Sequence, residues 1–250
     1  TSLDSPNEEN HDSFRGVAGS FKAALKGTEH LVNAGYQPQI IMSPHRGNIN
    51  EVEDLVKLAL KIGAGSVKFN PVTPTGRGKT MNKKGETLDF DETMNLVHFI
   101  RGELKEKYKI RLIISTPPAL STLREILQEK RAGSECRVLN ILGILGNGDM
   151  ALCGIGRNIP ELCFGNLAKN DLRHIWVSHA TLNQLRKDLN GNYPGICGDC
   201  VHARRCLTHC VAMNYVRTGK LVYPDILCEE AERRGFFPET RRRNYPNKSF

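Results

Sequence analysis

The first part of the chain contains four predicted helices, two of which rest on apolar residues at helical spacing. Residues 17–34 carry them every three or four positions, and residues 50–63 form an amphipathic pattern; both are predicted helices that end at a glycine, Gly35 and Gly63. A third helix is predicted from Asp89 or Asp91 to about Tyr108, because an aspartate can cap its first turn. Pro117 and Pro118 open a fourth, to about Arg131.

Short runs rich in Ile, Val and Phe separate these helices and predict strands at 38–43, 66–72 and 110–116, after a strand end at residues 1–4. Strands that alternate with helices predict a parallel sheet with crossover helices, which is an α/β architecture. Four strands are few for a closed barrel. We therefore expect half of a larger barrel, in a chain that begins within a longer protein. Residues 71–85, rich in Pro and Gly, are predicted to form a loop.

The pattern changes after about residue 135. Asn147-Gly148 predicts the tight turn of a hairpin within residues 136–153. Residues 170–191 are predicted to be one helix, or two helices broken near Ser178, and residues 195–228 are predicted to be loop-like. The expected division is an α/β half (1–132), a cysteine-rich domain (133–238) and a basic C-terminal tail (239–250).

Composition and charge indicate which kinds of binding partner, among nucleic acids, peptides and membranes, suit this chain. The formal net charge is +8, but basic residues are spread along predicted helices, and the one dense run is "RRR" at 241–243. Aromatic residues do not alternate with basic ones as a base-stacking platform requires, so a nucleic-acid surface is not favoured, whereas an acidic peptide fits. No stretch approaches the roughly 18 apolar residues that span a bilayer, and the first residues do not form a signal peptide. We expect a cytoplasmic protein without a membrane partner.

All eight cysteines lie at or after residue 136, and "CGDCVHARRCLTHC" (197–210) holds four of them. Disulfides need an oxidising compartment, for which the chain shows no export signal. Zinc and a cubane iron–sulfur cluster both take four thiolates, so spacing alone does not separate them. The gaps of five and three residues that follow Cys200 and Cys206 depart from paired zinc knuckles. Seven cysteines also come close to the eight that two four-iron clusters need.

The spacing C-x11-G-x4-C, gap, C-x2-C-x5-C-x3-C, gap, C resembles the seven-cysteine SPASM domain of radical SAM enzymes of the peptide-modifying type. "FGNL" (164–167) followed by "IW" (175–176) also resembles that domain. "SLDSPNEENHDSFRG" (2–16) and "VKFNPVTPTGRG" (67–78) resemble the segments after the fourth and at the sixth barrel strand of these enzymes. The resemblance implies the second half of a partial (β/α)6 radical SAM barrel, followed by a SPASM domain with a β-hairpin.

The C-x3-C-x2-C motif that binds the S-adenosylmethionine-cleaving cluster in this family does not occur in these residues. After Cys206-x3-Cys210 the third position is Met213. We expect the motif upstream of residue 1, and therefore expect the 250 residues alone to be inactive. A non-catalytic homologue is the alternative.

The resemblance also implies ligands for two auxiliary 4Fe-4S clusters. The first would take Cys136, Cys153 and Cys210, and the second would take Cys197, Cys200, Cys206 and Cys228. Cys163 stands outside the pattern: it either completes the first cluster or is a small buried apolar residue. Five histidines show no paired spacing that indicates a metal site: His11, His45, His174, His179 and His209.

For S-adenosylmethionine the resemblance implies Ser2 and Arg15 at the amino-acid end, and Val72 and Thr73 near the adenine. A serine that caps its own turn and a surface arginine are the plain alternatives. Sulfatase-maturing members carry an aspartate base directly after the cysteine matched by Cys153. This chain has Gly154 there, so no catalytic residue is assigned.

The implied function is modification of a ribosomally made peptide by 5′-deoxyadenosyl radical chemistry, with a third cluster in the upstream part. The expected partners are a peptide or small-protein substrate and an electron donor such as ferredoxin or flavodoxin. "ALCGIG" (151–156) and "GFFPETR" (235–241) resemble peptide maturases more than the haem-synthesis branch. The alternatives are a haem-synthesis-type radical SAM enzyme and a zinc-stabilised, non-catalytic binding module. Arg77, Lys79, Lys83 and Lys84 are expected to place positive charge on a mobile loop, 71–86, that meets an acidic precursor.

Overall fold

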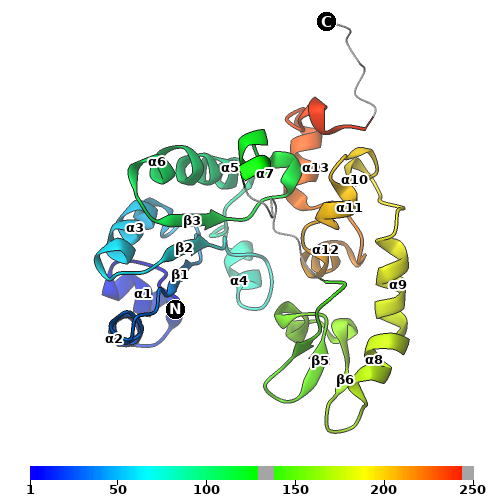
Figure 1. The fold of residues 1–250 in the computed structure, drawn as a ribbon, viewed down its shortest axis with the longest axis horizontal. Coiled ribbons are helices and arrows are strands. Elements are labelled where there is room, and N and C mark those ends of the chain that lie inside the picture. Colours follow the sequence, from blue (N-terminus) through cyan, green and yellow to red (C-terminus); the bar gives the residue numbers. More distant parts are fainter. Residues whose placement is uncertain (129–137, 244–250) are drawn as a thin grey trace, which may run out of the picture. The chain divides into compact units, whose positions relative to one another are not determined.

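The computed structural model describes residues 1–128 and 138–243. The chain divides into two compact units, Thr1–Ser115 and Thr116–Phe250 (Figure 1). The predicted boundary between residues 132 and 133 falls at 129–137, outside the described residues.

A parallel sheet forms the centre of the first unit. Its strands are β1 (Gln39–Met42), β2 (Ser66–Phe69) and β3 (Arg111–Ile114), in the order β1-β2-β3. The first residues of the chain extend the sheet beyond β1, since Leu3 N–H donates to the Ile41 carbonyl (3.0 Å) and Ile41 N–H donates to the Thr1 carbonyl (2.9 Å). The predicted α/β architecture is confirmed.

The crossover helices pack on this sheet. They are α2 (Ser20–Asn33), α3 (Val52–Lys61) and α5 (Phe90–His98), which continues through a π-helical turn (Phe99–Leu104) into α6 (Lys105–Lys107). Asp89 is the cap of α5: its side chain accepts from Glu92 N–H while the Glu92 side chain accepts from Asp89 N–H. Apolar side chains of both layers form the core, among them Ile40, Met42, Phe69, Val56, Leu96 and Ile100.

Two helices of this unit were not predicted. In α1 (Glu8–Arg15) His11 is the one buried residue, so the sequence shows no apolar period there; caps at Asn7 and Gly16 define its ends. The predicted loop 71–85 contains α4 (Gly78–Lys83), which is too short to reveal a period.

The predicted helix 117–131 was wrong in its first half. Pro118–Leu120 is a 3-10 turn, Ser121 is extended, and α7 runs over Leu123–Gln128. Thr122 restarts the helix, because its hydroxyl accepts from Glu125 N–H (3.2 Å) and the Glu125 carboxylate accepts from Thr122 N–H (2.8 Å). Residues 129–131 lie outside the described part.

The second unit begins with an antiparallel sheet of β4 (Gly143–Ile144), β5 (Asp149–Ala151) and β6 (Cys163–Asn166). The 3-10 turns Gly154–Asn158 and Pro160–Leu162 join β5 to β6. Helices α8 (Leu172–Ser178) and α9 (Ala180–Asp188) are separated at His179, where the backbone is extended. Of the two alternatives left by the sequence, the broken helix is found.

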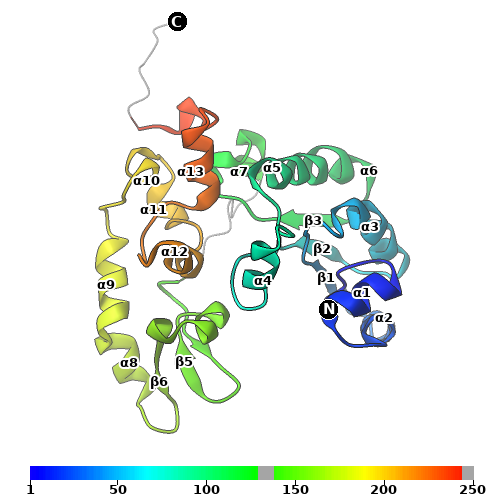
Figure 2. The ribbon, with the colours of Figure 1, turned by 180° about the vertical axis from the view of Figure 1, so that it is seen from behind.

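The expectation of a loop-like stretch over 195–228 was wrong. It contains α10 (Ile196–Asp199), α11 (Ala203–Cys206), α12 (Val211–Thr218) and the start of α13 (Ile226–Arg233). The first two helices are about one turn long, so no 3.6-residue period can appear in their sequence. Figure 2 shows this group of short helices from behind.

The arginine run at 241–243 is bound within the second unit. It follows a 3-10 turn, Glu239–Arg241. The Arg242 side chain contacts the carboxylates of Asp199 (3.2 Å), Glu232 (2.5 Å) and Glu239 (3.3 Å). Arg243 N–H donates to the Asp199 carbonyl (2.7 Å). These arginines are therefore used in internal contacts; residues 244–250 lie outside the described part.

None of the helices described is both long and apolar enough to cross a membrane.

A buried polar network, which the sequence did not reveal, joins the start of the chain to the end of β1. The Asp4 side chain, 1% exposed, pairs with Arg15 (2.5 Å) and accepts from Ser43 N–H (2.8 Å). The backbone carbonyl of Asp4 accepts from the Asn48 side-chain amide (2.8 Å). The backbone N–H of Asp4 donates to Nδ1 of the buried His11 (3.0 Å). Because His11 Nδ1 accepts a hydrogen bond, the ring is held as the neutral tautomer with its proton on Nε2.

This tautomer predicts an acid-sensitive fold. Burial lowers the pKa of His11; the nearby Asp4 and Asp12 oppose the effect and Arg15 adds to it. The unfolded chain, with a histidine pKa near its ordinary 6.5, then binds more protons than the folded chain between that value and the lowered one. We expect the free energy of unfolding to fall as the pH drops through this window and to level off below it.

Urea unfolding of wild type and His11→Gln at a series of pH values measures this effect. The glutamine keeps an acceptor for Asp4 N–H but does not titrate, so the difference between the two curves isolates His11 from His45, His179 and His202, whose pKa values burial also lowers. Parallel curves for the two proteins would contradict the assignment.

Candidate functional site

Three cysteines that lie close together in sequence meet a fourth, from a later helix, in the second unit. Cys197 lies in α10, Cys200 follows it, Cys206 ends α11 and Cys228 lies in α13; each is at most 9% exposed. Figures 1 and 2 both show α10, α11 and α13 side by side. This set equals the four ligands that the family resemblance implies for the second cluster.

Burial and mutual charge both act on the pKa values of these thiols. Burial raises the pKa of all four, that of Cys197 to about 12. For Cys228 the charges of Asp225, Cys197, Cys206 and Cys200 add to this effect, and for Cys206 those of Cys197, Asp225 and Cys200 do so. Thiols that repel each other's negative charge in a buried site stay protonated at neutral pH unless a cation takes the place of the protons.

Backbone N–H groups already point at two of these sulfurs. His202 N–H donates to Cys200 Sγ (3.4 Å), and the backbone N–H of Ala203 also stabilises the Cys200 thiolate. The backbone N–H of His209 does the same for Cys206. Hydrogen bonds to the sulfurs are a regular feature of iron–sulfur sites, where they set the reduction potential. The donor set therefore fits a four-thiolate cluster.

The spacing of the thiols bears on zinc. Within 1–128 and 138–243, no group of three or more His, Cys, Asp or Glu side chains is gathered closely enough to hold one metal ion. A zinc ion with bonds of about 2.3 Å would need its four thiolates roughly 3.8 Å apart. In a cubane each thiolate binds a different iron, so neighbouring thiolates stand farther apart. Both cofactors take four thiolates, so metal analysis of the reconstituted protein distinguishes them.

A left-handed turn separates Cys206 from Cys210. Leu207, Thr208 and His209 all have positive φ angles, of 52°, 62° and 66°. After this turn Cys210 caps α12 and is only half-buried. Cys206 lies among the four thiols described above. The turn can thus send two cysteines of one short motif in different directions, as ligands of two clusters require.

Only two of the three cysteines predicted to bind the first cluster are among the described residues. Cys136 lies outside the described residues, and Cys153 and Cys210 are half-buried. The Cys163 thiol donates to the Gly156 carbonyl (3.3 Å), and burial raises its pKa. This contact agrees with a small residue packed inside the fold, and the role of Cys163 as a ligand stays a prediction.

The residues predicted for S-adenosylmethionine lie in the first unit, at the carboxyl edge of its sheet. Ser2 pairs beside Ile41, and Val72, just after β2, donates its N–H to the Pro44 carbonyl (3.0 Å). Thr73 is exposed and its hydroxyl is 3.3 Å from that of Thr75. Ligands of open α/β sheets bind at this edge. Arg15, in contrast, already has an internal partner in Asp4.

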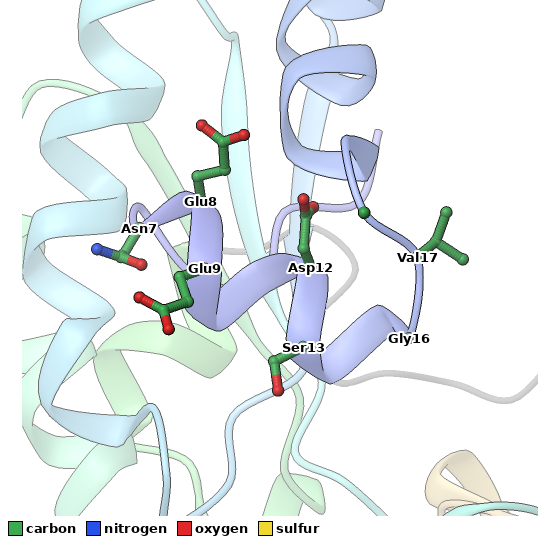
Figure 3. A pocket seen from close by; sticks show the side chains of 8 residues that line it. Asn7, Glu8, Glu9, Asp12, Ser13, Gly16 and Val17 are labelled. Carbon is green, nitrogen blue, oxygen red and sulfur yellow. The ribbon is translucent and has the colours of Figure 1, made fainter.

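A surface pocket over α1 is separate from the residues predicted to bind S-adenosylmethionine. Figure 3 shows the Glu8, Glu9 and Asp12 side chains projecting from α1 in different directions. The Asp12 carboxylate caps α2, since it accepts from Gly19 N–H (2.6 Å), the Ser20 hydroxyl (2.7 Å) and Phe21 N–H (2.8 Å), and these bonds lower its pKa. The residues predicted for the cofactor do not line this pocket, and its Asp12 carboxylate serves the fold.

Residues 136–201 match the SPASM family, an iron–sulfur cluster-binding domain. The AdoMet-dependent heme synthase of Methanosarcina barkeri is 26% identical over 241 residues, which cover 91% of this chain and 66% of the relative. The antilisterial bacteriocin subtilosin biosynthesis protein AlbA of Bacillus subtilis is 38% identical over 78 residues, which cover 31% of this chain and 17% of the relative. Streptococcus suis SuiB bound to precursor peptide SuiA superposes with a TM-score of 0.64 at 13% identity, over 91% of this chain and 52% of SuiB.

These matches confirm the family resemblance that the cysteine spacing predicted. The chain carries a SPASM domain, and its relatives are radical SAM/SPASM enzymes. The likeness to SuiB, at its low identity, shows the fold alone. The chain spans about two thirds of the length of the heme synthase and about half of SuiB.

Proposed function

We propose that this chain is the C-terminal part of a radical SAM/SPASM enzyme that modifies a ribosomally made peptide and carries two auxiliary 4Fe-4S clusters. The observation that carries the proposal is the buried set of Cys197, Cys200, Cys206 and Cys228, brought together from a stretch of 32 residues (197–228). The names of AlbA, linked to subtilosin biosynthesis, and of SuiB, bound to a precursor peptide, support a peptide substrate.

The residues have distinct roles in this proposal. The four buried cysteines hold the second cluster; Cys136, Cys153 and Cys210 hold the first; Cys163 packs in the fold. Ser2, Val72 and Thr73 bind S-adenosylmethionine at the sheet edge, and Arg15 keeps Asp4 in place. When bound, S-adenosylmethionine supplies the radical and the clusters exchange single electrons, while the chain excludes water and oxygen.

These 250 residues do not cleave S-adenosylmethionine by themselves in this proposal, because they contain no C-x3-C-x2-C motif. Ferredoxin or flavodoxin is the proposed electron donor. The proposed location is the cytoplasm, where cysteine thiols stay reduced and can serve as cluster ligands.

A haem-synthesis-type enzyme is the second candidate. The match that favours it is the heme synthase relative, which aligns with nearly the whole chain. The match to AlbA has a higher sequence identity, but it covers less than a third of this chain. Both candidates use the same cofactors, so the substrate has to decide between them.

The segment 71–86 offers a basic surface for an acidic substrate. Arg77, Lys79, Lys83 and Lys84 are exposed and have no carboxylate partner in the described part of the chain. The segment is fixed at its far end, since the Arg46 side chain donates to the Gly85 carbonyl (2.7 Å) and Arg46 N–H donates to the Glu86 carbonyl (3.0 Å). The segment expected to be a mobile lid thus contains a short helix, α4, and hydrogen bonds from Arg46 attach its C-terminal end to the first unit.

Glycine permits the start of this helix. A Cβ at Gly78 would stand 2.0 Å from the Thr73 carbonyl oxygen, so any other residue would push α4 away from residues 72–73. The helix therefore holds its positive charge next to the residues proposed to bind the adenine.

Replacing Arg77, Lys79, Lys83 and Lys84 together by alanine is expected to weaken binding of an acidic precursor peptide about tenfold at low salt, because exposed charges act there with least screening. Fluorescence anisotropy with a labelled peptide, at several salt concentrations, measures the effect in the full-length protein. The control changes Lys26, Lys61, Lys105 and Lys109 to alanine, which removes the same charge from other exposed sites.

Equal loss of affinity in both variants would mean that net charge, not this helix, attracts the peptide. Binding of an anionic tetrapyrrole with no affinity for peptide would favour the haem-synthesis candidate. Loss of salt-sensitive DNA binding in the first variant would favour a nucleic-acid surface.

A further inference from the structure

A hydroxyl group two residues after Cys206 is buried without a hydrogen-bond partner among the described residues. Thr208 is 1% exposed, and its Oγ1 has no partner among the described residues. Its carbonyl, in contrast, accepts from the Asn214 amide (2.9 Å) and from Cys210 N–H (2.9 Å). Burying a hydroxyl without a partner costs about 1–3 kcal/mol, so the position of this group needs a reason.

The backbone at Thr208 is strained as well. Its φ of +62° is rare for a β-branched residue, and glycine or asparagine would adopt it at lower cost. The surroundings hold the strain: Asn214 bridges the carbonyls of Thr208 and Tyr223, and His209 Nδ1 lies 2.8 Å from Asp225 Oδ2. Strain that the fold maintains in this way is typical of functional sites.

The strained turn folds back on a proposed cluster ligand. Thr208 comes two residues after Cys206, and His209 N–H donates to the Cys206 carbonyl (3.0 Å). The same N–H stabilises the Cys206 thiolate. The turn that fixes the buried hydroxyl therefore also directs a donor to the sulfur of Cys206, which lies among Cys197, Cys200 and Cys228.

We propose that the Thr208 hydroxyl donates a hydrogen bond to a sulfur of the cluster held by Cys197, Cys200, Cys206 and Cys228, and so raises its reduction potential. This inference rests on the cluster assignment of the proposed function. The reduced cluster carries one more negative charge than the oxidised cluster, so its sulfurs accept the bond more strongly and reduction becomes easier. Thr208 is then a positioning residue that tunes the cluster.

The test compares Thr208→Val, which has the same shape without the hydroxyl, with Thr208→Ser, which keeps the hydroxyl. Both are reconstituted anaerobically with iron and sulfide, and the cluster is titrated with dithionite and followed by electron paramagnetic resonance. The signal of this cluster is identified by its loss in Cys197→Ala. In Thr208→Val we expect roughly tenfold less reduced cluster at a fixed potential, which corresponds to a reduction potential lower by about 59 mV for one electron. In Thr208→Ser we expect the reduction potential of the wild-type protein.

Thr28→Val is the matched control. Thr28 is fully buried in the first unit, and its hydroxyl donates to the Ala24 carbonyl (2.8 Å), so the same chemical change there must leave the potential unaltered. A Thr208→Val protein that binds iron with the wild-type potential overturns the inference and leaves the proposed function standing. A shift confined to the other cluster also overturns it. Wild-type protein that binds zinc and no iron would instead overturn the proposed function.

Discussion

Cys206→Ala is expected to lose about half of the bound iron. Two four-iron clusters give the reconstituted wild-type protein about eight irons and a broad visible absorbance, and the variant should retain about four. The chain should also unfold more readily, because cluster binding supplies folding free energy to a unit whose helices here are about one or two turns long. Iron analysis and thermal unfolding of the reconstituted protein measure both effects.

Cys163→Ala is the matched control for this experiment. Its thiol contacts the Gly156 carbonyl, so alanine should keep all of the iron and cost about 1 kcal/mol. Equal iron loss in the two variants would make Cys163 a ligand and complete the first cluster. Zinc without iron in the wild-type protein would contradict the cluster assignment and support a zinc-stabilised module.

Asp4→Ala is expected to cost about 3 kcal/mol of folding stability. The change removes a carboxylate that is 1% exposed, leaves Ser43 N–H without its acceptor and leaves Arg15 without its partner. Breaking one side of a buried ion pair typically costs this much, and Arg15, at 31% exposure, can recover part of its hydration. Chemical denaturation of the chain gives the free-energy difference.

Asp54→Ala provides the comparison. Its carboxylate pairs with Lys57 at 2.7 Å but is 61% exposed, so we expect a change below about 1 kcal/mol. If Asp4→Ala were equally mild, the network at the sheet edge would not stabilise the fold. Arg15 would then be available to bind the carboxylate of S-adenosylmethionine, as the family resemblance implies.

Much of the first unit could be predicted from its sequence because its elements have local signals. The apolar period of 50–63 predicts α3, and Asp89, one of the two aspartates expected as a cap, begins α5. The short runs at 38–43 and 66–72 predict β1 and β2. Helix α1 was missed because its buried face consists of one histidine, and α4 was missed because six residues show no period.

For the cysteine site, too, the sequence predicted one part and only the tertiary structure showed the other. The cysteine spacing indicated the resemblance to a SPASM domain, because ligand spacing is a property of the chain itself, and that resemblance implied Cys197, Cys200, Cys206 and Cys228 as one set. Only the tertiary structure shows that these four are buried together, that Asp4 occupies Arg15, and that the Thr208 hydroxyl has no partner. Burial and pairing depend on which distant segments pack against each other, and no local pattern in a single sequence records that choice.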